Sequence, residues 1–106
     1  MQVVLCEPRK EAIVTKIENS LETMQNIVGG LIQVIYPFDD NIALVCNDEG
    51  KINNLPYNRR LLDRKGNLLD IIADTFFICS FDEEENFISL TDDQAEKYKN
   101  VFNLIY

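Results

Sequence analysis

Residues 47–60, with the sequence NDEGKINNLPYNRR, hold the side chains whose types and spacing best suit binding chemistry. Asn donates and accepts hydrogen bonds at once, so it can recognise a ligand or a peptide, or brace an irregular backbone from within. The charged groups between the amides could grip a polar or anionic molecule. The candidate residues for binding a ligand or partner are Asn47, Glu49, Lys51, Asn53, Asn54, Asn58, Arg59 and Arg60. The sequence leaves both bracing and recognition open for this segment.

Catalytic chemistry has weaker support in this sequence. The chain has no His, which is the commonest general base and the commonest metal ligand. The carboxylates that could pair for acid–base work or for Mg²⁺ are Asp39, Asp40, Glu49, Asp70 and Asp74. Each falls at a predicted turn or strand end, where Asp is favoured for bonding the backbone. We therefore name no catalytic residue, metal site or cofactor, and favour a protein that is not an enzyme.

Two further groups of residues could carry chemistry. Cys6, Cys46 and Cys79 are far apart and each adjoins an apolar run, which is typical of buried reduced thiols. The basic side chains of residues 59–65 could contact an anion or nucleic acid, or could lie on a solvated turn with carboxylate partners.

Size and charge limit the class of protein. A chain of 106 residues suits a single domain, 1–106, without a linker. Its formal net charge of -8 disfavours direct contact with nucleic acid or an anionic membrane. No run approaches the roughly 18 apolar residues that span a bilayer, so we expect a cytoplasmic protein. The sequence does not specify an oligomeric state.

The elements that must position these residues follow from periodicity. Residues 2–8 and 12–18 predict a strand hairpin, although a helix over 9–28 competes with it. Asn19 or Ser20 should cap a short helix near 20–28 that exits at Gly29 and Gly30. Residues 31–38 and 41–47 are apolar at nearly every position, which predicts two central strands covered on both faces.

The second half of the chain is less regular. Residues 59–67 predict one helical turn, a strand returns around Phe76 to Cys79, and residues 82–86 form an exposed turn. Thr91 and Gln94 predict a capping box for a C-terminal helix near 92–104. Together the elements predict an α+β fold, with both helices packed on a mostly antiparallel or mixed sheet of about five strands.

Three stretches, LETMQNIVGGLIQVIYPFDDNIALVCNDEGKINNLPYNRRL, DIIADTFFICSF and SLTDDQAEKY, resemble the bacterial family catalogued as domain of unknown function 3846. The resemblance covers nearly the whole chain, and its most specific parts are residues 28–30, 47–58 and 70–72. This chain has Asp74 where such sequences often have Gly, and an Asp is less suited than a Gly to a tight turn at that position. The resemblance implies a small protein of bacteria, phages and mobile elements, and it brings no established activity.

Three hypotheses about function remain, one of them the nucleic-acid contact through residues 59–65 described above. We favour a non-enzymatic accessory protein that binds another macromolecule, because an acidic surface attracts a basic partner. In one version the chain mimics DNA and inhibits a nucleic-acid-handling protein. The alternative is a small polar or anionic ligand binder, or a minor hydrolase, with a pocket under the 47–60 loop.

Overall fold

The structure, a computed structural model, describes residues 1–50, 53–63 and 65–103. It is an α+β domain with a mostly antiparallel sheet and two helices, which confirms the predicted fold class. The first sheet has the strand order β2-β1-β7-β4-β3, with β8 pairing β7, and a second sheet consists of β5 and β6. The strands are β1 (Gln2–Cys6), β2 (Ile13–Lys16), β3 (Ile32–Ile35), β4 (Ile42–Asn47), β5 (Tyr57–Leu62), β6 (Leu68–Ala73), β7 (Phe76–Phe81) and β8 (Phe87–Ile88).

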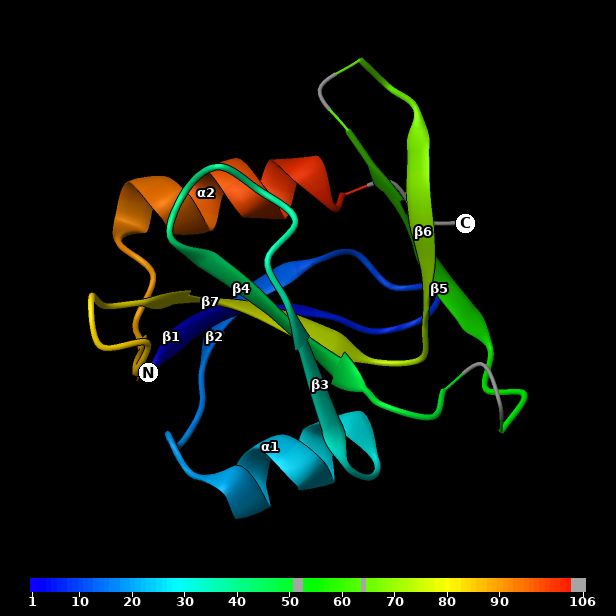
Figure 1. The fold of residues 1–106 in the computed structure, drawn as a ribbon, viewed down its shortest axis with the longest axis horizontal. Helices are drawn as coiled ribbons and strands as arrows, with labels where there is room; N and C mark the ends of the chain where they lie inside the picture. The colour runs from blue at the N-terminus through cyan, green and yellow to red at the C-terminus, as the bar shows by residue number, and fades with distance from the viewer. Residues whose placement is uncertain (51–52, 64, 104–106) are drawn as a thin grey trace.

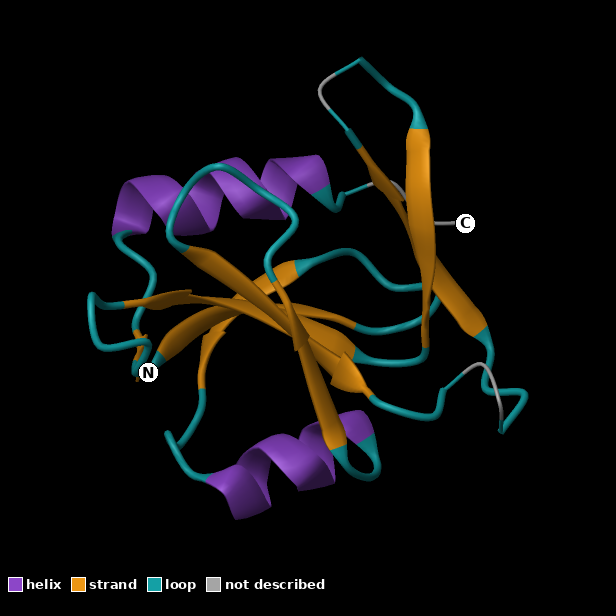
Figure 2. Ribbon diagram, viewed as in Figure 1, coloured by secondary structure: helices purple, strands orange, loops and turns teal. Residues whose placement is uncertain are grey.

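The two helices lie on opposite faces of the first sheet (Figure 2). Helix α1 (Leu21–Val28) buries Met24 and Val28 against β-strand residues such as Phe77. Helix α2 (Asp92–Val101) buries Tyr98 on the other face, in a cluster that also contains Phe76. Adjacent residues of β7 therefore enter different cores, since successive side chains of a strand point to opposite faces.

The capping residues in the sequence predicted the starts of both helices and the end of α1 correctly. Ser20 is the N-cap of α1, and its side chain accepts from the backbone of Thr23. Gly29 follows in the left-handed region at φ 79°, where a residue without Cβ is favoured. Thr91 and Gln94 form the predicted capping box of α2, which ends at Val101. The rest of the range predicted for that helix lies partly outside the described residues.

Two expectations about the strands were wrong. Residues 59–67 were predicted as a helical turn, but residues 59–62 belong to β5, and the other described residues of this range precede β6. Strand β5 pairs with β6 as a separate ribbon, which stands beside the main sheet in Figure 1. Residues 31–38 were predicted as a central strand, but β3 is at the end of the sheet order. An apolar sequence therefore does not show that a strand is paired on both sides: β3 is apolar, yet it lies at the edge of the sheet.

A sharp turn joins β6 to β7 at Asp74. This residue has φ 59°, in the region that L residues rarely occupy. Its backbone N–H donates to the carbonyl of Pro56 at 2.6 Å. Asp74 thus makes the tight turn that a Gly would make with less strain, because Asp is among the residues that tolerate this conformation.

Candidate functional site

The candidate segment 47–60 begins at the end of β4 with an amide that ties two elements together. Asn47 donates from Nδ2 to the carbonyl of Val28 at 3.0 Å, and its Oδ1 accepts from the backbone of Glu49 at 2.8 Å. A Cβ at Gly30 would lie 3.1 Å from the Asn47 amide nitrogen, closer than side chains normally approach. Asn47 therefore holds the exit of α1 against β4, and Gly30 leaves room for it.

The middle of the segment is a loop with internal backbone bonds. The N–H of Asn53 donates to Glu49, and that of Leu55 donates to Gly50, both at 2.9 Å. Asn54 has φ 56°, a conformation that Asn tolerates better than most residues. Glu49, Asn53 and Asn54 are exposed, so they remain predicted binding residues. Lys51 lies outside the described residues.

The end of the segment is buried. Asn58 and Arg59 are each 1% exposed, although both are polar. Asn58 donates from Nδ2 to the carbonyls of Cys6, at 2.9 Å, and Asp74, at 2.7 Å. Its amide oxygen accepts from Arg59 Nη1 at 2.6 Å. The pair thereby connects β5 to the end of β1 and to the β6–β7 turn.

Arg59 also joins the ribbon to the C-terminal helix. Its Nε donates to the carbonyl of Phe102, the C-cap of α2, at 2.9 Å, and Nη2 donates to the carbonyl of Lys10. A cation is favoured at a helix C-terminus, where unpaired carbonyls carry partial negative charge. In the structure, Asn58 and Arg59 brace the fold, whereas the neighbouring Arg60 is exposed. Binding by Arg60 stays a prediction.

A small pocket adjoins the start of the candidate segment. Its volume is about 300 Å³, and its lining includes Gln33, Asn47, Gly50 and Asp70. The ribbon strand β6 forms one wall, and the main sheet forms the other. The ligand-binding hypothesis predicted a pocket under the 47–60 loop. Of the described candidate residues only Asn47 lines this pocket, and its amide is already engaged with the backbone.

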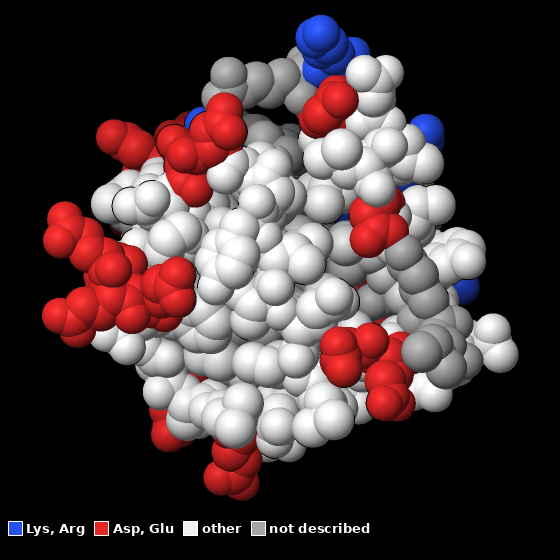
Figure 3. Space-filling view, viewed as in Figure 1, with Lys and Arg blue, Asp and Glu red and all other residues white. Residues whose placement is uncertain are grey.

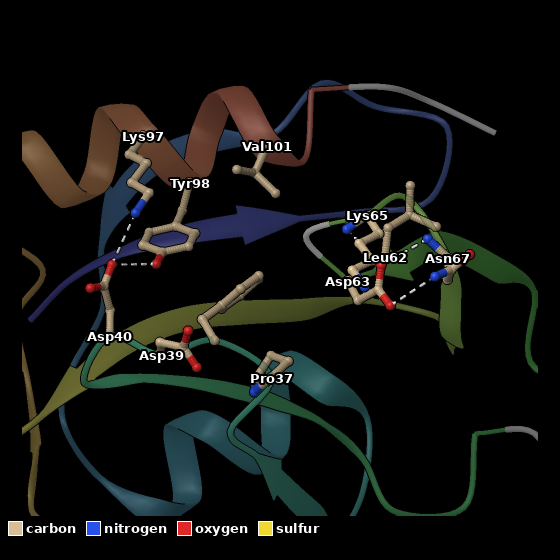
Figure 4. A pocket seen from close by; sticks show the side chains of 11 residues that line it. Pro37, Asp39, Asp40, Leu62, Asp63, Lys65, Asn67, Lys97, Tyr98 and Val101 are labelled. Atoms are coloured by element: carbon tan, nitrogen blue, oxygen red, sulfur yellow. Dashed lines mark hydrogen bonds and ion pairs between the residues drawn. The ribbon is translucent and has the colours of Figure 1, made fainter.

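A larger groove lies between α2, the β3–β4 connection and the turn of the β5–β6 ribbon (Figure 4). Its volume is about 620 Å³. Phe38, Leu62 and Val101 contribute apolar surface, and charged side chains of both signs stand around it. The charged residues that line the groove are Asp39, Asp40, Asp63, Lys65 and Lys97.

One wall of the groove is a fixed polar cluster. Asp40 Oδ2 accepts from Tyr98 Oη at 2.8 Å and from Lys97 Nζ at 3.0 Å. Burial raises the pKa of the Tyr98 hydroxyl, and the hydrogen bond and charge of Asp40 raise it further. Tyr98 therefore stays protonated and donates to Asp40 at all ordinary pH values.

Asp63 is the opposite polar group of this groove, on the ribbon turn. Its carboxylate accepts from the backbone N–H groups of Lys65 and Asn67, at 2.8 and 2.9 Å. These bonds, with that to Asn67 first, lower the pKa of Asp63 below its usual range. The carboxylate therefore organises the turn as an anion.

Sequence reasoning did not place this groove. Asp39 and Asp40 were weighed as carboxylates, but the predicted site residues of segment 47–60 do not line it. Tyr98, on the buried side of α2, lines the groove although it is only 1% exposed. The groove forms where α2 and the ribbon turn lie close together in space. These segments are distant in the sequence, so no local sequence pattern predicts the groove.

Reactive chemistry has little support in the part of the chain that the structure describes. All three Cys residues are buried, and burial raises the pKa of Cys6 and of Cys79 to about 12. Within those residues no cluster of three or more potential ligands could hold a metal ion. The five carboxylates weighed for catalysis are spread over different places, with Asp40 in the groove and Asp70 in the small pocket.

Among the described residues, no helix has the length and apolar character needed to cross a bilayer. Comparison with curated proteins and with solved structures finds no match.

A comparison with protein families does give a match. The family described as "Domain of unknown function (DUF3846)" matches residues 1–103. Two of the motifs that carried the earlier resemblance lie in the braces above, since Asn47 contacts Val28 and Asn58 contacts the Asp74 turn. The match covers nearly all of the 106 residues, so this chain belongs to the DUF3846 family, whose function is unknown.

Proposed function

We propose that this protein is a non-enzymatic binding protein whose partner is a basic macromolecule. The observation that carries the proposal is the distribution of charge on the face seen in Figure 3. There, acidic side chains stand around a band of surface that carries no charge. The formal net charge of -8 adds a long-range attraction for a basic partner, which speeds encounter and favours specificity.

The arrangement suits a protein partner with apolar and basic surface. An interface generally has an apolar centre and a polar rim, and acids at this rim would pair with Lys or Arg. In the narrower version of the proposal, that partner is a nucleic-acid-handling protein in the cytoplasm of a bacterium with phages or mobile elements. This chain would then occupy the site that DNA occupies.

The proposal is tested by selecting binders from a random peptide library displayed against the immobilised protein. We expect enrichment of peptides rich in Lys and Arg, with affinities that fall as NaCl rises. A matched variant, Asp39→Asn with Asp48→Asn and Glu49→Gln, removes three exposed charges and should weaken the selected peptides by about tenfold. Enrichment of neutral or acidic peptides would contradict the proposal.

The DNA-mimic version requires a further result. A partner recovered with this protein should lose its affinity for duplex DNA when this protein is added, because both would use one site. Simultaneous binding of both would refute mimicry and leave binding to a basic partner intact.

A second candidate function rests on the small pocket beside Asn47. A polar ligand of low molecular mass would contact Gln33 and Asp70 there, at the wall between the ribbon and the main sheet. Thermal-shift measurements with a panel of metabolites test this idea, with Asp70→Asn as the site variant and Asp93→Asn as the control on exposed helix surface. A ligand that stabilises both variants equally would exclude this pocket.

A further inference from the structure

The edge strand β3 has features that edge strands usually avoid. Strand β3 is at one end of the main sheet, and in the residues that the structure describes it pairs with β4 alone. Residues 31–36, LIQVIY, contain no charged side chain, although edges are commonly protected by Lys or other charges. At the opposite edge, β2 carries Lys16. Because residues 31–38 are apolar at nearly every position, the sequence predicted a central strand there.

In β3, alternate residues bond to β4, and the backbone groups of the residues between them point away from the sheet. The N–H of Asp48 donates to the carbonyl of Leu31 at 2.8 Å, so these two residues form a bonded pair. Bonded pairs alternate in an antiparallel ladder, and Gln33 and Ile35 therefore also bond toward β4. Ile32 and Val34 then direct their N–H and C=O groups to the open side. These groups could bond an additional strand.

Apolar side chains are exposed at both ends of this edge. Leu31 is 61% exposed and Tyr36 is 53% exposed. Tyr36 is held in place by an edge-on contact with Phe81, with ring centroids 5.1 Å apart. A fixed aromatic ring costs little entropy when it is covered, which makes it an effective contact residue.

Carboxylates flank the same edge. Asp48 and Glu49 are exposed beside the Leu31 end, and the exposed Asp39 follows Tyr36 at the other end, next to Asp40, which pairs with Lys97. In Figure 3 the uncharged band crosses the region where β3 lies in Figure 1, with acidic groups on its margins. The edge therefore offers backbone bonds and apolar contacts in the middle and negative charge at both ends.

We propose that β3 accepts an extended segment of a partner protein as an added strand, apolar in its centre and with Lys or Arg on both sides. This inference rests on the proposed function and specifies the surface and the mode of binding. A second copy of this chain fits less well as the occupant. If two β3 strands paired in antiparallel fashion, the carboxylates at the Leu31 end of one copy would lie beside those at the Tyr36 end of the other. These like charges would repel each other.

The test uses a synthetic peptide with two basic residues at each end and Val-Thr-Val-Ile in the centre. Titration into the ¹⁵N-labelled protein should shift the amide signals of residues 31–36. Hydrogen exchange at Ile32 and Val34 should slow, because their N–H groups become bonded in the complex. Two further peptides carry N-methyl groups on one or the other set of alternate residues. The one whose methyl groups replace the N–H groups that face β3 should lose most of its affinity, since it cannot complete the ladder.

Matched variants separate this edge from general attraction between charges. Leu31→Lys with Tyr36→Lys adds two charges to the β3 edge at exposed positions, and should weaken the peptide by at least about tenfold. Ile13→Lys with Val14→Lys adds the same charge at the β2 edge, where both residues are exposed, and should change affinity by less than about twofold. The melting temperature of each variant checks that it is folded.

The outcomes distinguish this inference from the proposed function. Peptide binding that shifts signals elsewhere, or that tolerates N-methylation of both alternate sets, would refute strand addition at β3 and leave binding to a basic partner standing. Failure of every basic peptide to bind, at low salt as well, would refute both. A dimer of this chain that the Leu31→Lys and Tyr36→Lys variant dissociates would show that the occupant is a second copy, against the inference.

Discussion

Arg59 and Arg60 are neighbours in the sequence, with identical side chains in opposite environments. Arg59 is buried and donates to the side-chain amide oxygen of its neighbour Asn58 and to the backbone carbonyls of Lys10 and Phe102, which are distant in the sequence. Arg60 points to the exposed side of the same strand. The planar guanidinium suits this role because its five donors have a fixed geometry that an ammonium cannot reproduce.

Arg59→Lys should therefore lower the free energy of unfolding by about 2–4 kcal/mol, because buried carbonyls lose their donors. Urea denaturation measures the change. Arg60→Lys is the matched control and should stay within about 0.5 kcal/mol of the parent. Equal effects of the two substitutions would contradict the bracing role of Arg59.

The buried thiols predict how stability depends on alkaline pH. Burial raises the pKa of Cys6 and Cys79 to about 12, from 9.0, with the positive charge of Arg59 opposing the shift at Cys6. Above pH 9 the unfolded chain releases these protons while the folded chain keeps them, so their contribution is complete below pH 9 and is lost as the pH rises toward 12. Each thiol adds a slope of up to about 1.4 kcal/mol per pH unit in that window.

Urea denaturation between about pH 8 and pH 11 tests this prediction. A variant with Cys6→Ala and Cys79→Ala should show a shallower fall in stability than the parent, because the other titrating groups are unchanged. Parallel curves for the two proteins would mean that these thiols titrate alike in the folded and unfolded chains.

At the scale of elements, the same turn closes two hairpins. Residues 63–67 and 82–86 both begin with Asp and end with Asn, and both Asp carboxylates accept from the backbone N–H of that Asn. The fourth residue is left-handed in each, Gly66 at φ 82° and Glu85 at φ 64°. A three-residue hairpin loop requires this conformation at its last position, and Gly adopts it without strain.

Glu85→Gly should therefore stabilise the protein by about 0.5–1 kcal/mol, since it removes strain at an exposed position. Glu84→Gly removes the same charge at a neighbouring residue outside the left-handed set, so it should be neutral or destabilising. Thermal unfolding of the two variants gives the comparison. A gain in both would assign the effect to charge and exclude the backbone strain.

At the scale of the whole molecule, the net negative charge affects the stability of the fold. Eighteen acidic residues face ten basic ones, so the folded chain carries more mutual repulsion than the expanded chain does. We expect the melting temperature to rise by roughly 4–8 °C between about 10 mM and 0.5 M NaCl, which corresponds to about 1 kcal/mol for a domain of this size.

The same measurement with sucrose at matched osmolality is the control, because sucrose does not screen charges. A melting temperature that falls with NaCl would show that attractive ion pairs, such as the one between Lys97 and Asp40, outweigh the net repulsion.

Much of this fold is determined by local sequence. The capping residues Ser20 and Thr91 and the left-handed Gly29 define helix ends through bonds within a few residues, so they can be read directly from the sequence. The β1–β2 hairpin and the burial of the three thiols are set in the same way, by alternating and apolar runs.

Tertiary structure decided the features that depend on distant contacts. The partners of Arg59 lie 49 residues before it and 43 residues after it, at Lys10 and Phe102, so sequence patterns could not distinguish it from Arg60. Strand β5 was missed because its polar Asn58 and Arg59 are stabilised by backbone groups of other elements. The position of β3 at an edge follows from the order of strand pairing, and the apolar pattern of a strand does not encode which neighbours it will have.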